Sequence, residues 1–177
     1  MDATARARHI KLMAFDVDGV LTDGTLFFTS QGDEMKAFSS LDGHGIKMLK
    51  QAGIEVAIIS GRASLALEHR ARNLGITRLH QGIEDKRGTM SRLLDELGLT
   101  SAQAGYMGDD IVDLPILRLC GFSATVADGH AFVKQHVDYV AQRGGGRGAV
   151  REVCDFVLSA QGQLEAMLNS YLAPRGA

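Results

Sequence analysis

Short apolar runs typical of buried strands alternate with stretches of helical periodicity along almost the whole chain of 177 residues. This alternation predicts an α/β fold, a Rossmann-like parallel sheet with helices on both faces. The predicted strands are residues 10–15, 55–60, 79–81, 104–108, 122–126 and 139–140. The predicted helices are residues 42–51, 64–74, 86–97, 111–119, 130–136 and a long helix from the glycine-rich stretch at 144–148 to about 172.

One segment departs from the alternation, because residues 25–39 have the pattern of a β-hairpin around a glycine-containing turn. Its apolar side chains are more than one small flap needs, and an isolated hairpin is marginally stable in water. These side chains are Leu26, Phe28, Met35 and Phe38. The hairpin is therefore expected to pack either on its own domain or on another subunit.

The length predicts one domain over residues 1–177, with the hairpin at about 25–39 and the glycine-rich loop and last helix at about 144–172. The formal net charge of −2 argues against a nucleic-acid binder. Cys120 and Cys154 are isolated in apolar surroundings, which predicts reduced core thiols and a cytoplasmic protein. Neither a membrane span nor a secretory signal is expected. The six histidines lack metal-ligand spacing, so no zinc site is expected.

The first predicted strand ends in two carboxylates, Asp16 and Asp18, on alternate positions that project to the same side. Two carboxylates held this close repel unless a cation lies between them or one binds a proton. A divalent metal beside a second acid that carries protons fits a phosphate-handling site, and an exposed Asp-x-Asp-Gly turn is the alternative for this motif alone. Ser60 and Asp109 also follow strands, where ligands of such sheets bind.

Four elements occur in a specific order: Asp16-Val-Asp18-Gly, Ser60 after a β-branched strand, Lys86 at the start of a helix, and Gly108-Asp-Asp110 after a further strand. Together they resemble the haloacid dehalogenase superfamily of phosphohydrolases, over about residues 9–160. The resemblance implies that Asp16 is the nucleophile and becomes an aspartyl-phosphate. It also implies that Ser60 and Lys86 bind the phosphoryl oxygens. Mg²⁺ would be held by Asp16, the backbone carbonyl of Asp18, and Asp109.

The charge of the substrate supports this interpretation independently. A phosphomonoester carries close to two negative charges near neutral pH, so an anionic nucleophile needs a cation that removes the repulsion. Asp18 stands where a general acid and base would protonate the leaving alcohol and then activate water, whereas related transport ATPases carry Thr there. Asp110 and Asp113 are interpreted as supporting residues, and helix capping is the alternative for both. Ser60 as a helix cap and Lys86 as a solvated lysine are the corresponding alternatives.

The spacing leaves no room for a cap domain, since about 40 residues separate Asp18 from Ser60 and the hairpin and one helix use them. This arrangement, with the motifs LDGHGIK, IISGR and GRGAVREVCDFVL, is similar to the 3-deoxy-D-manno-octulosonate 8-phosphate (KDO 8-phosphate) phosphatases, a capless family. That resemblance implies a homotetramer joined through the hairpins, in which neighbouring subunits close each site. The implied substrate-binding positions are Asp18, Ser39, Ser40, Leu41, Asp42, Gly43, Arg62, Arg70 and Lys86.

Two arginines suit the carboxylate of a sugar acid, because guanidinium binds carboxylate in a bidentate fork. These are Arg62 and Arg70, and a surface helix residue is the alternative interpretation of Arg70. Leu41 departs from the basic residue common in the family. Arg147 either reaches a neighbour's site or belongs to a mobile tail.

The implied function is Mg²⁺-dependent hydrolysis of KDO 8-phosphate to KDO and phosphate, in lipopolysaccharide biosynthesis. A capless phosphatase for another sugar-acid phosphate, such as a nonulosonate 9-phosphate, is the nearest alternative. A phosphoacceptor signalling domain is an alternative from a different class, but its acidic pair precedes the strand that bears the acceptor aspartate. An inactive relative is not favoured, because every expected catalytic residue is present.

Overall fold

The computed structural model describes residues 2–172, so both ends of the predicted domain, residue 1 and residues 173–177, lie outside it. Six parallel strands form one sheet in the order β5-β4-β1-β6-β7-β8. All six predicted strands are present, and their ends differ from the predicted ones by at most two residues. The strands are β1 (Leu12–Phe15), β4 (Glu55–Ile59), β5 (Arg78–His80), β6 (Ala104–Met107), β7 (Phe122–Thr125) and β8 (Tyr139–Val140).

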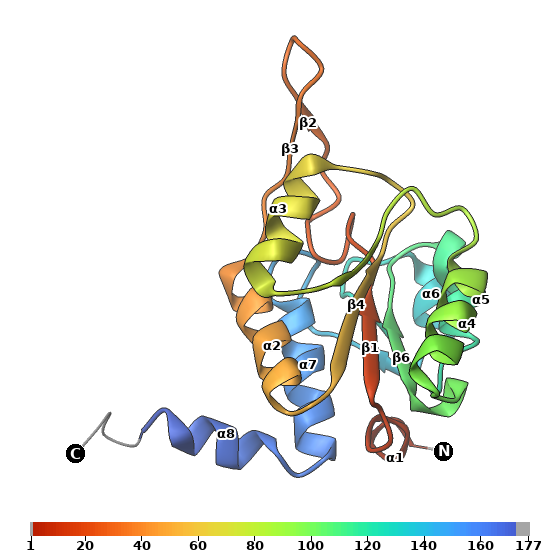
Figure 1. Ribbon diagram of the computed structural model, residues 1–177, viewed down its shortest axis with the longest axis vertical. Helices are drawn as coiled ribbons and strands as arrows, with labels where there is room; N and C mark the ends of the chain where they lie inside the picture. The colour runs from red at the N-terminus through yellow and green to blue at the C-terminus, as the bar shows by residue number, and fades with distance from the viewer. Residues whose placement is uncertain (1, 173–177) are drawn as a thin grey trace.

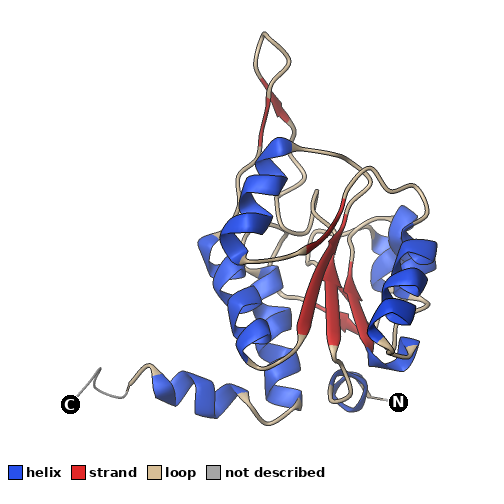
Figure 2. Cartoon of the chain, viewed as in Figure 1, coloured by secondary structure: helices blue, strands red, loops and turns tan. Residues whose placement is uncertain are grey.

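Helices cover both faces of this sheet, which confirms the predicted fold class (Figures 1 and 2). One face carries α2 (Ser40–Gln51), α3 (Leu65–Leu74) and α7 (Ala149–Ala160). The short α1 (Ala3–Ala7), which the sequence pattern does not predict, packs on this face as well. The opposite face carries α4 (Lys86–Leu97), α5 (Leu114–Leu117) and α6 (Ala131–Lys134).

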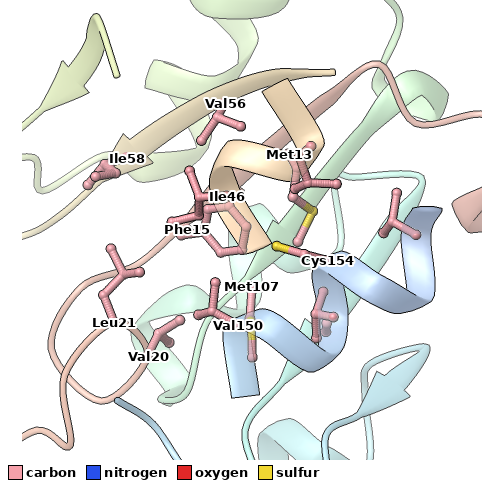
Figure 3. Packing of buried hydrophobic residues seen from close by; sticks show 14 of the residues in the cluster. Met13, Phe15, Val20, Leu21, Ile46, Val56, Ile58, Met107, Val150 and Cys154 are labelled. Atoms are coloured by element: carbon pink, nitrogen blue, oxygen red, sulfur yellow. The ribbon is translucent and has the colours of Figure 1, made fainter. Parts of the chain in front are cut away.

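The central strand β1 is buried on both faces, because successive side chains of a strand point to opposite sides. Met13 and Phe15 join the cluster under α2 and α7, whereas Leu12 and Ala14 join the cluster under α4 and α5. Figure 3 shows the first cluster, with Ile46 of α2 and Val150 and Cys154 of α7 packed around Phe15. Burying a side chain such as Phe15 stabilises the fold by about 1.5–3 kcal/mol. Because the core packs against both faces of β1, the position of its carboxyl end in the sheet is fixed.

The strand order places the first and fourth strands of the sheet side by side. Counted without the hairpin, the order is 3-2-1-4-5-6, and β1 lies between β4 and β6. The connections leave β1 and β6 in opposite directions, which opens a crevice beyond their carboxyl ends. Asp16 directly follows β1, and Asp109 lies two residues beyond β6. The topology therefore brings together two acids that lie far apart in the sequence.

The prediction of one long last helix is wrong, because the chain forms two helices there, α7 and α8 (Leu164–Ser170). Gly162 between them has a φ of +71°, a left-handed conformation that ends a helix. α8 leads away from α7 at the lower left of Figure 1. The helix predicted over residues 111–119 is also shorter, because it consists of a 3₁₀ turn, η2 (Ile111–Asp113), and α5. Another 3₁₀ turn, η1 (Ser101–Gln103), precedes β6 without having been predicted.

The hairpin is present but its strands are short, β2 (Phe27–Phe28) and β3 (Glu34–Met35). It projects from the end of the molecule where the sheet strands terminate, at the top of Figure 1. Leu26, Phe27, Phe28 and Met35 are 41–59% exposed, whereas Phe38 at the base packs against the core. Cys120 and Cys154 are buried and unbridged. Within residues 2–172, no helix combines the length and apolarity needed to cross a bilayer.

Candidate active site

A cavity of about 480 Å³ lies beyond the carboxyl ends of β1, β4 and β6. Residues from all four sequence motifs line it, so the fold brings together the elements that the sequence spreads over about 95 positions. The predicted residues in its wall are Asp16, Asp18, Ser60, Arg62, Lys86, Asp109 and Asp110. The wall is completed by four residues that were not predicted as site residues, Gly61, Ile83, Glu84 and Val112.

Strand register sets the position of the two acids at the ends of β1 and β6. Phe15 pairs with Met107, and the Asp16 backbone N–H donates to the Met107 carbonyl at 2.9 Å. Gly19 then turns the chain with a φ of +87° beneath the Asp109 carboxylate. A Cβ at Gly19 would lie 2.2 Å from Asp109 Oδ2, so only glycine allows this close approach.

Lys86 joins the acids at the floor of the cavity. Its Nζ lies 2.9 Å from Asp16 Oδ2 and 2.7 Å from Asp113 Oδ1, and the residue is 7% exposed. Burial disfavours the ammonium, but the carboxylates of Asp16 and Asp113 outweigh it and raise the pKa of Lys86. The side chain of Asp85 caps the start of α4 by accepting from the Gly88 N–H at 2.8 Å. Lys86 is therefore a fixed cation in the site and not a solvated lysine of the first turn.

Asp113 supports this arrangement from below and is fully buried. Its Oδ1 accepts from Lys86, and its Oδ2 accepts from the backbone N–H groups of Asp109 at 3.1 Å and Asp110 at 3.4 Å. The Tyr106 hydroxyl lies 3.1 Å from Asp113 Oδ1 and 3.4 Å from Lys86 Nζ. Sequence reasoning missed Tyr106, and the signal was a lone large polar residue in the strand Ala-Gly-Tyr-Met before the Gly-Asp-Asp motif. Asp110 caps η2 by accepting from the Ile111 N–H at 2.7 Å.

The acids of the site repel one another. Burial and the nearby Asp113 carboxylate raise the pKa of Asp16 to about 7, although Lys86 opposes the change. Burial, Asp16 and Asp113 raise the pKa of Asp109 to about 7 as well. Ligand atoms of these three residues lie within 4.8 Å of one another. Both Asp113 oxygens already accept hydrogen bonds, so Asp16 and Asp109 are the side chains free to bind an ion, and their hard oxygens fit Mg²⁺.

Asp18 lies beside two cations at the mouth of the cavity, with its side chain 21% exposed. The Lys36 ammonium contacts Asp18 Oδ1, and Arg62 Nε lies 3.6 Å from Asp18 Oδ2. Glu34 contacts both cations, at 3.3 Å from Lys36 Nζ and 2.9 Å from Arg62 Nη2. Glu34 and Lys36 were not predicted as site residues, although two charges at alternate positions in an otherwise apolar hairpin arm were the signal.

Of the remaining predicted residues, Ser60 lies in this cavity, whereas Ser39 and Asp42 lie near the starts of α2 and α7. Ser60 is 1% exposed at the end of β4, and its Oγ accepts from the Arg62 N–H at 3.3 Å. Ser39 caps α2, and the buried Asp42 carboxylate accepts from the N–H groups of Gly148 at 3.2 Å and Arg151 at 2.8 Å. Asp42 therefore satisfies free N–H groups at the start of α7 and does not face the cavity.

A separate hollow of about 220 Å³ is lined by part of the predicted substrate-binding group. Arg70 donates to the Ser39 carbonyl at 2.8 Å and lies over the Phe38 ring, 5.7 Å from its centre. Ser40 and Gly43 share this hollow with Arg70, whereas Leu41 is exposed on the other side of α2. The Arg147 side chain is 73% exposed and lies 3.6 Å from Asp23. Within one chain, these residues therefore lie outside the cavity at the carboxyl ends of β1, β4 and β6.

Known proteins are similar to this chain in sequence over most of its length. The 3-deoxy-D-manno-octulosonate 8-phosphate phosphatase KdsC of Escherichia coli (strain K12) is 46% identical over 164 residues, which cover 93% of this chain and 87% of that protein. The KdsC of Yersinia pestis is 47% identical over the same length, 93% of this chain and 88% of that protein. No protein-family model matches the chain.

Solved structures of phosphatases are similar to this chain over almost its whole length. A probable YrbI family phosphatase from Pseudomonas syringae pv. phaseolica has a TM-score of 0.97 at 49% identity, with 98% of this chain and 99% of that one covered. The KDO 8-phosphate phosphatase of Moraxella catarrhalis, solved with magnesium, phosphate and KDO, has a TM-score of 0.93 at 42% identity, with 96% and 97% covered. The chain belongs to the 3-deoxy-D-manno-octulosonate 8-phosphate phosphatase family, within the haloacid dehalogenase superfamily.

Proposed function

We propose that this protein is a Mg²⁺-dependent phosphomonoesterase that hydrolyses KDO 8-phosphate to KDO and phosphate, in lipopolysaccharide biosynthesis. The observation that carries the proposal is the cluster of Asp16, Lys86 and Asp109 at the ends of β1 and β6. It occurs in a chain 42% identical to a KDO 8-phosphate phosphatase solved with magnesium, phosphate and KDO. These relatives favour KDO 8-phosphate over a nonulosonate 9-phosphate and over a phosphoacceptor signalling role.

Each residue has a role that its position supports. Asp16 attacks phosphorus and becomes an aspartyl-phosphate while Asp18 protonates the leaving alcohol. Asp18 then takes a proton from a water molecule that attacks phosphorus, which breaks the bond to Asp16 and releases phosphate. Lys86 neutralises phosphoryl oxygens from the floor of the cavity, and Ser60 binds them from β4. Asp16, the Asp18 backbone carbonyl and Asp109 would hold Mg²⁺, which would shield the nucleophile from the negative charge of the ester. Asp113 and Asp110 hold this set in place.

The sugar acid would be bound by groups from more than one chain. Arg62 lies in the cavity wall and matches the substrate carboxylate. Arg70 and residues 39–43 lie outside the cavity of their own chain, so they would serve the site of a neighbouring subunit. The exposed apolar residues of the hairpin, Leu26, Phe27, Phe28 and Met35, support a homotetramer joined there. Arg147 is exposed enough to contribute as well.

The protein would act as one catalytic domain in the cytoplasm. Its two buried cysteines are unbridged, which is typical of a reducing compartment.

A panel of sugar phosphates with Mg²⁺ tests the proposal. Release of phosphate from KDO 8-phosphate should exceed release from a nonulosonate 9-phosphate by at least about tenfold in kcat/KM. EDTA should stop the reaction and Mg²⁺ should restore it. Preference for the nine-carbon substrate would contradict the substrate assignment, and a stable phosphoprotein without turnover would favour the signalling alternative. Asp16→Asn is the inactive control.

A further inference from the structure

The hairpin brings a charged pair onto the residue that the proposed reaction uses as its general acid and base. Glu34 lies in β3 and Lys36 follows directly after it, two positions further on, and the 3.3 Å contact between their side chains places both on the same side of the hairpin arm. Met35 between them faces the other way and is 59% exposed. One side of the arm is thus ionic and turned toward the cavity, and the other side is apolar and turned outward.

Lys36 is held far more tightly than a surface lysine. Its side chain is 2% exposed, and its ammonium contacts both Asp18 and Glu34. Arg62 completes a ring of four alternating charges, since it also contacts Asp18 and Glu34. An ammonium this deeply buried is desolvated, so leaving it without its carboxylate partners would cost free energy, and the two carboxylates hold it in place.

The contact between Lys36 and Asp18 restricts the orientation of the Asp18 carboxylate. The backbone of Asp18 lies in a turn after β1 that is closed by hydrogen bonds from the Val20 and Thr22 N–H groups to the Val17 carbonyl. Its carboxylate needs a second constraint in order to point toward the leaving oxygen. Within residues 2–172, the side-chain contacts of this carboxylate are to Lys36 and Arg62. Arg62 is 45% exposed and is the proposed partner of the substrate carboxylate, which leaves Lys36 as the constant partner.

We propose that Lys36 is a positioning residue that aims the Asp18 carboxylate at the leaving oxygen, with Glu34 holding Lys36 in place. The proposal rests on the proposed function, because it assigns Lys36 through the acid-base role of Asp18. It makes the hairpin part of the catalytic machinery: the same arm offers an apolar side to a partner and an ionic side to the acid.

Leaving-group dependence tests this proposal. We compare kcat/KM for KDO 8-phosphate and for p-nitrophenyl phosphate, whose leaving group departs without protonation. Lys36→Met should lower kcat/KM for the sugar phosphate by about ten- to a hundredfold, a part of the usual contribution of a general acid. It should lower the value for p-nitrophenyl phosphate much less. Equal losses on the two substrates would overturn the proposal, because they would indicate a purely structural role.

Matched variants separate positioning from folding. Lys36→Arg should restore most of the activity, and Lys11→Met, an exposed lysine at the opposite end of β1, should leave both values unchanged. In an Asp18→Ala background, Lys36→Met should add no further loss, because it acts through Asp18. Multiplicative losses there would refute the proposal. If Lys36→Met fails to fold by circular dichroism, Lys36→Gln takes its place.

The outcome also separates the two proposals. A wild-type protein that hydrolyses another sugar phosphate in preference to KDO 8-phosphate would overturn the substrate assignment alone. The leaving-group comparison would then be made with that sugar phosphate. A wild-type protein active on KDO 8-phosphate with an unaffected Lys36→Met variant would overturn only the role of Lys36.

Discussion

Asp113 gives a sharp test of how the site is built, because its carboxylate accepts on both oxygens in a fully buried position. Asp113→Asn keeps the shape but places an amide NH₂ against donors in either orientation. One orientation faces it toward the Lys86 ammonium, and the other faces it toward the N–H groups of Asp109 and Asp110. A buried donor left without an acceptor costs about 1–3 kcal/mol, and a broken buried ion pair costs about 3–5 kcal/mol.

Two features of the structure reduce that cost. Lys86 keeps Asp16 as a partner at 2.9 Å, and removing the Asp113 charge relieves repulsion on Asp16 and Asp109. We therefore expect the free energy of unfolding to fall by about 2–3 kcal/mol, within the range for an unpaired buried donor and below the range for a fully broken buried ion pair.

Urea denaturation in EDTA, followed by circular dichroism, measures this change. Tyr106→Phe, which removes one hydroxyl from the same network, should cost about 1 kcal/mol. Asp155→Asn, which breaks a partly exposed pair with Arg151, should cost no more than about 1 kcal/mol. If Asp113→Asn were no more destabilising than Asp155→Asn, the account of Asp113 as the support of the site would be wrong.

Three further predictions concern the metal, a turn and the assembly. Mg²⁺ should bind more weakly at about pH 6 than at about pH 8 and should release protons on binding, because the pKa values of Asp16 and Asp109 are raised to about 7. Calorimetry in buffers of different ionisation enthalpy measures the protons, and a pH-independent affinity would contradict this. Gly19→Ala should weaken Mg²⁺ binding at least about tenfold because its Cβ would collide with Asp109, whereas Gly32→Ala, with open space around it, should not. Phe28→Asp should convert the proposed tetramer into smaller species by light scattering; an unchanged mass would refute assembly through the hairpin.

The sequence was sufficient to predict the sheet and the centre of the site. Runs such as residues 10–15 and 55–60 are apolar on both faces, which identifies buried parallel strands. The carboxyl ends of such strands meet at one edge, so Asp16, Ser60 and Asp109 could be placed together without knowing the strand order. That order itself depends on long-range packing, which local periodicity does not report.

The rest of the site depends on how separate elements pack. The break at Gly162 was missed because a single glycine is tolerated inside many helices and here adopts a left-handed conformation. Asp42 belongs to the motif LDGHGIK, which resembles the family. In the structure, packing of α2 against α7 turns its carboxylate toward the N–H of Gly148. Lys36 was missed because its contact with Asp18 exists only once the chain folds and the end of β3 lies beside the turn after β1.

The most direct test of the central claim is to identify where phosphate attaches during turnover. The wild-type protein is mixed with Mg²⁺ and KDO 8-phosphate, quenched in acid within the first turnover, digested and analysed by mass spectrometry. The account predicts a phosphorylated carboxylate at Asp16 that disappears as substrate is consumed and is absent from Asp16→Asn. Phosphate attached to a different residue, or turnover by Asp16→Asn at the wild-type rate, would contradict it.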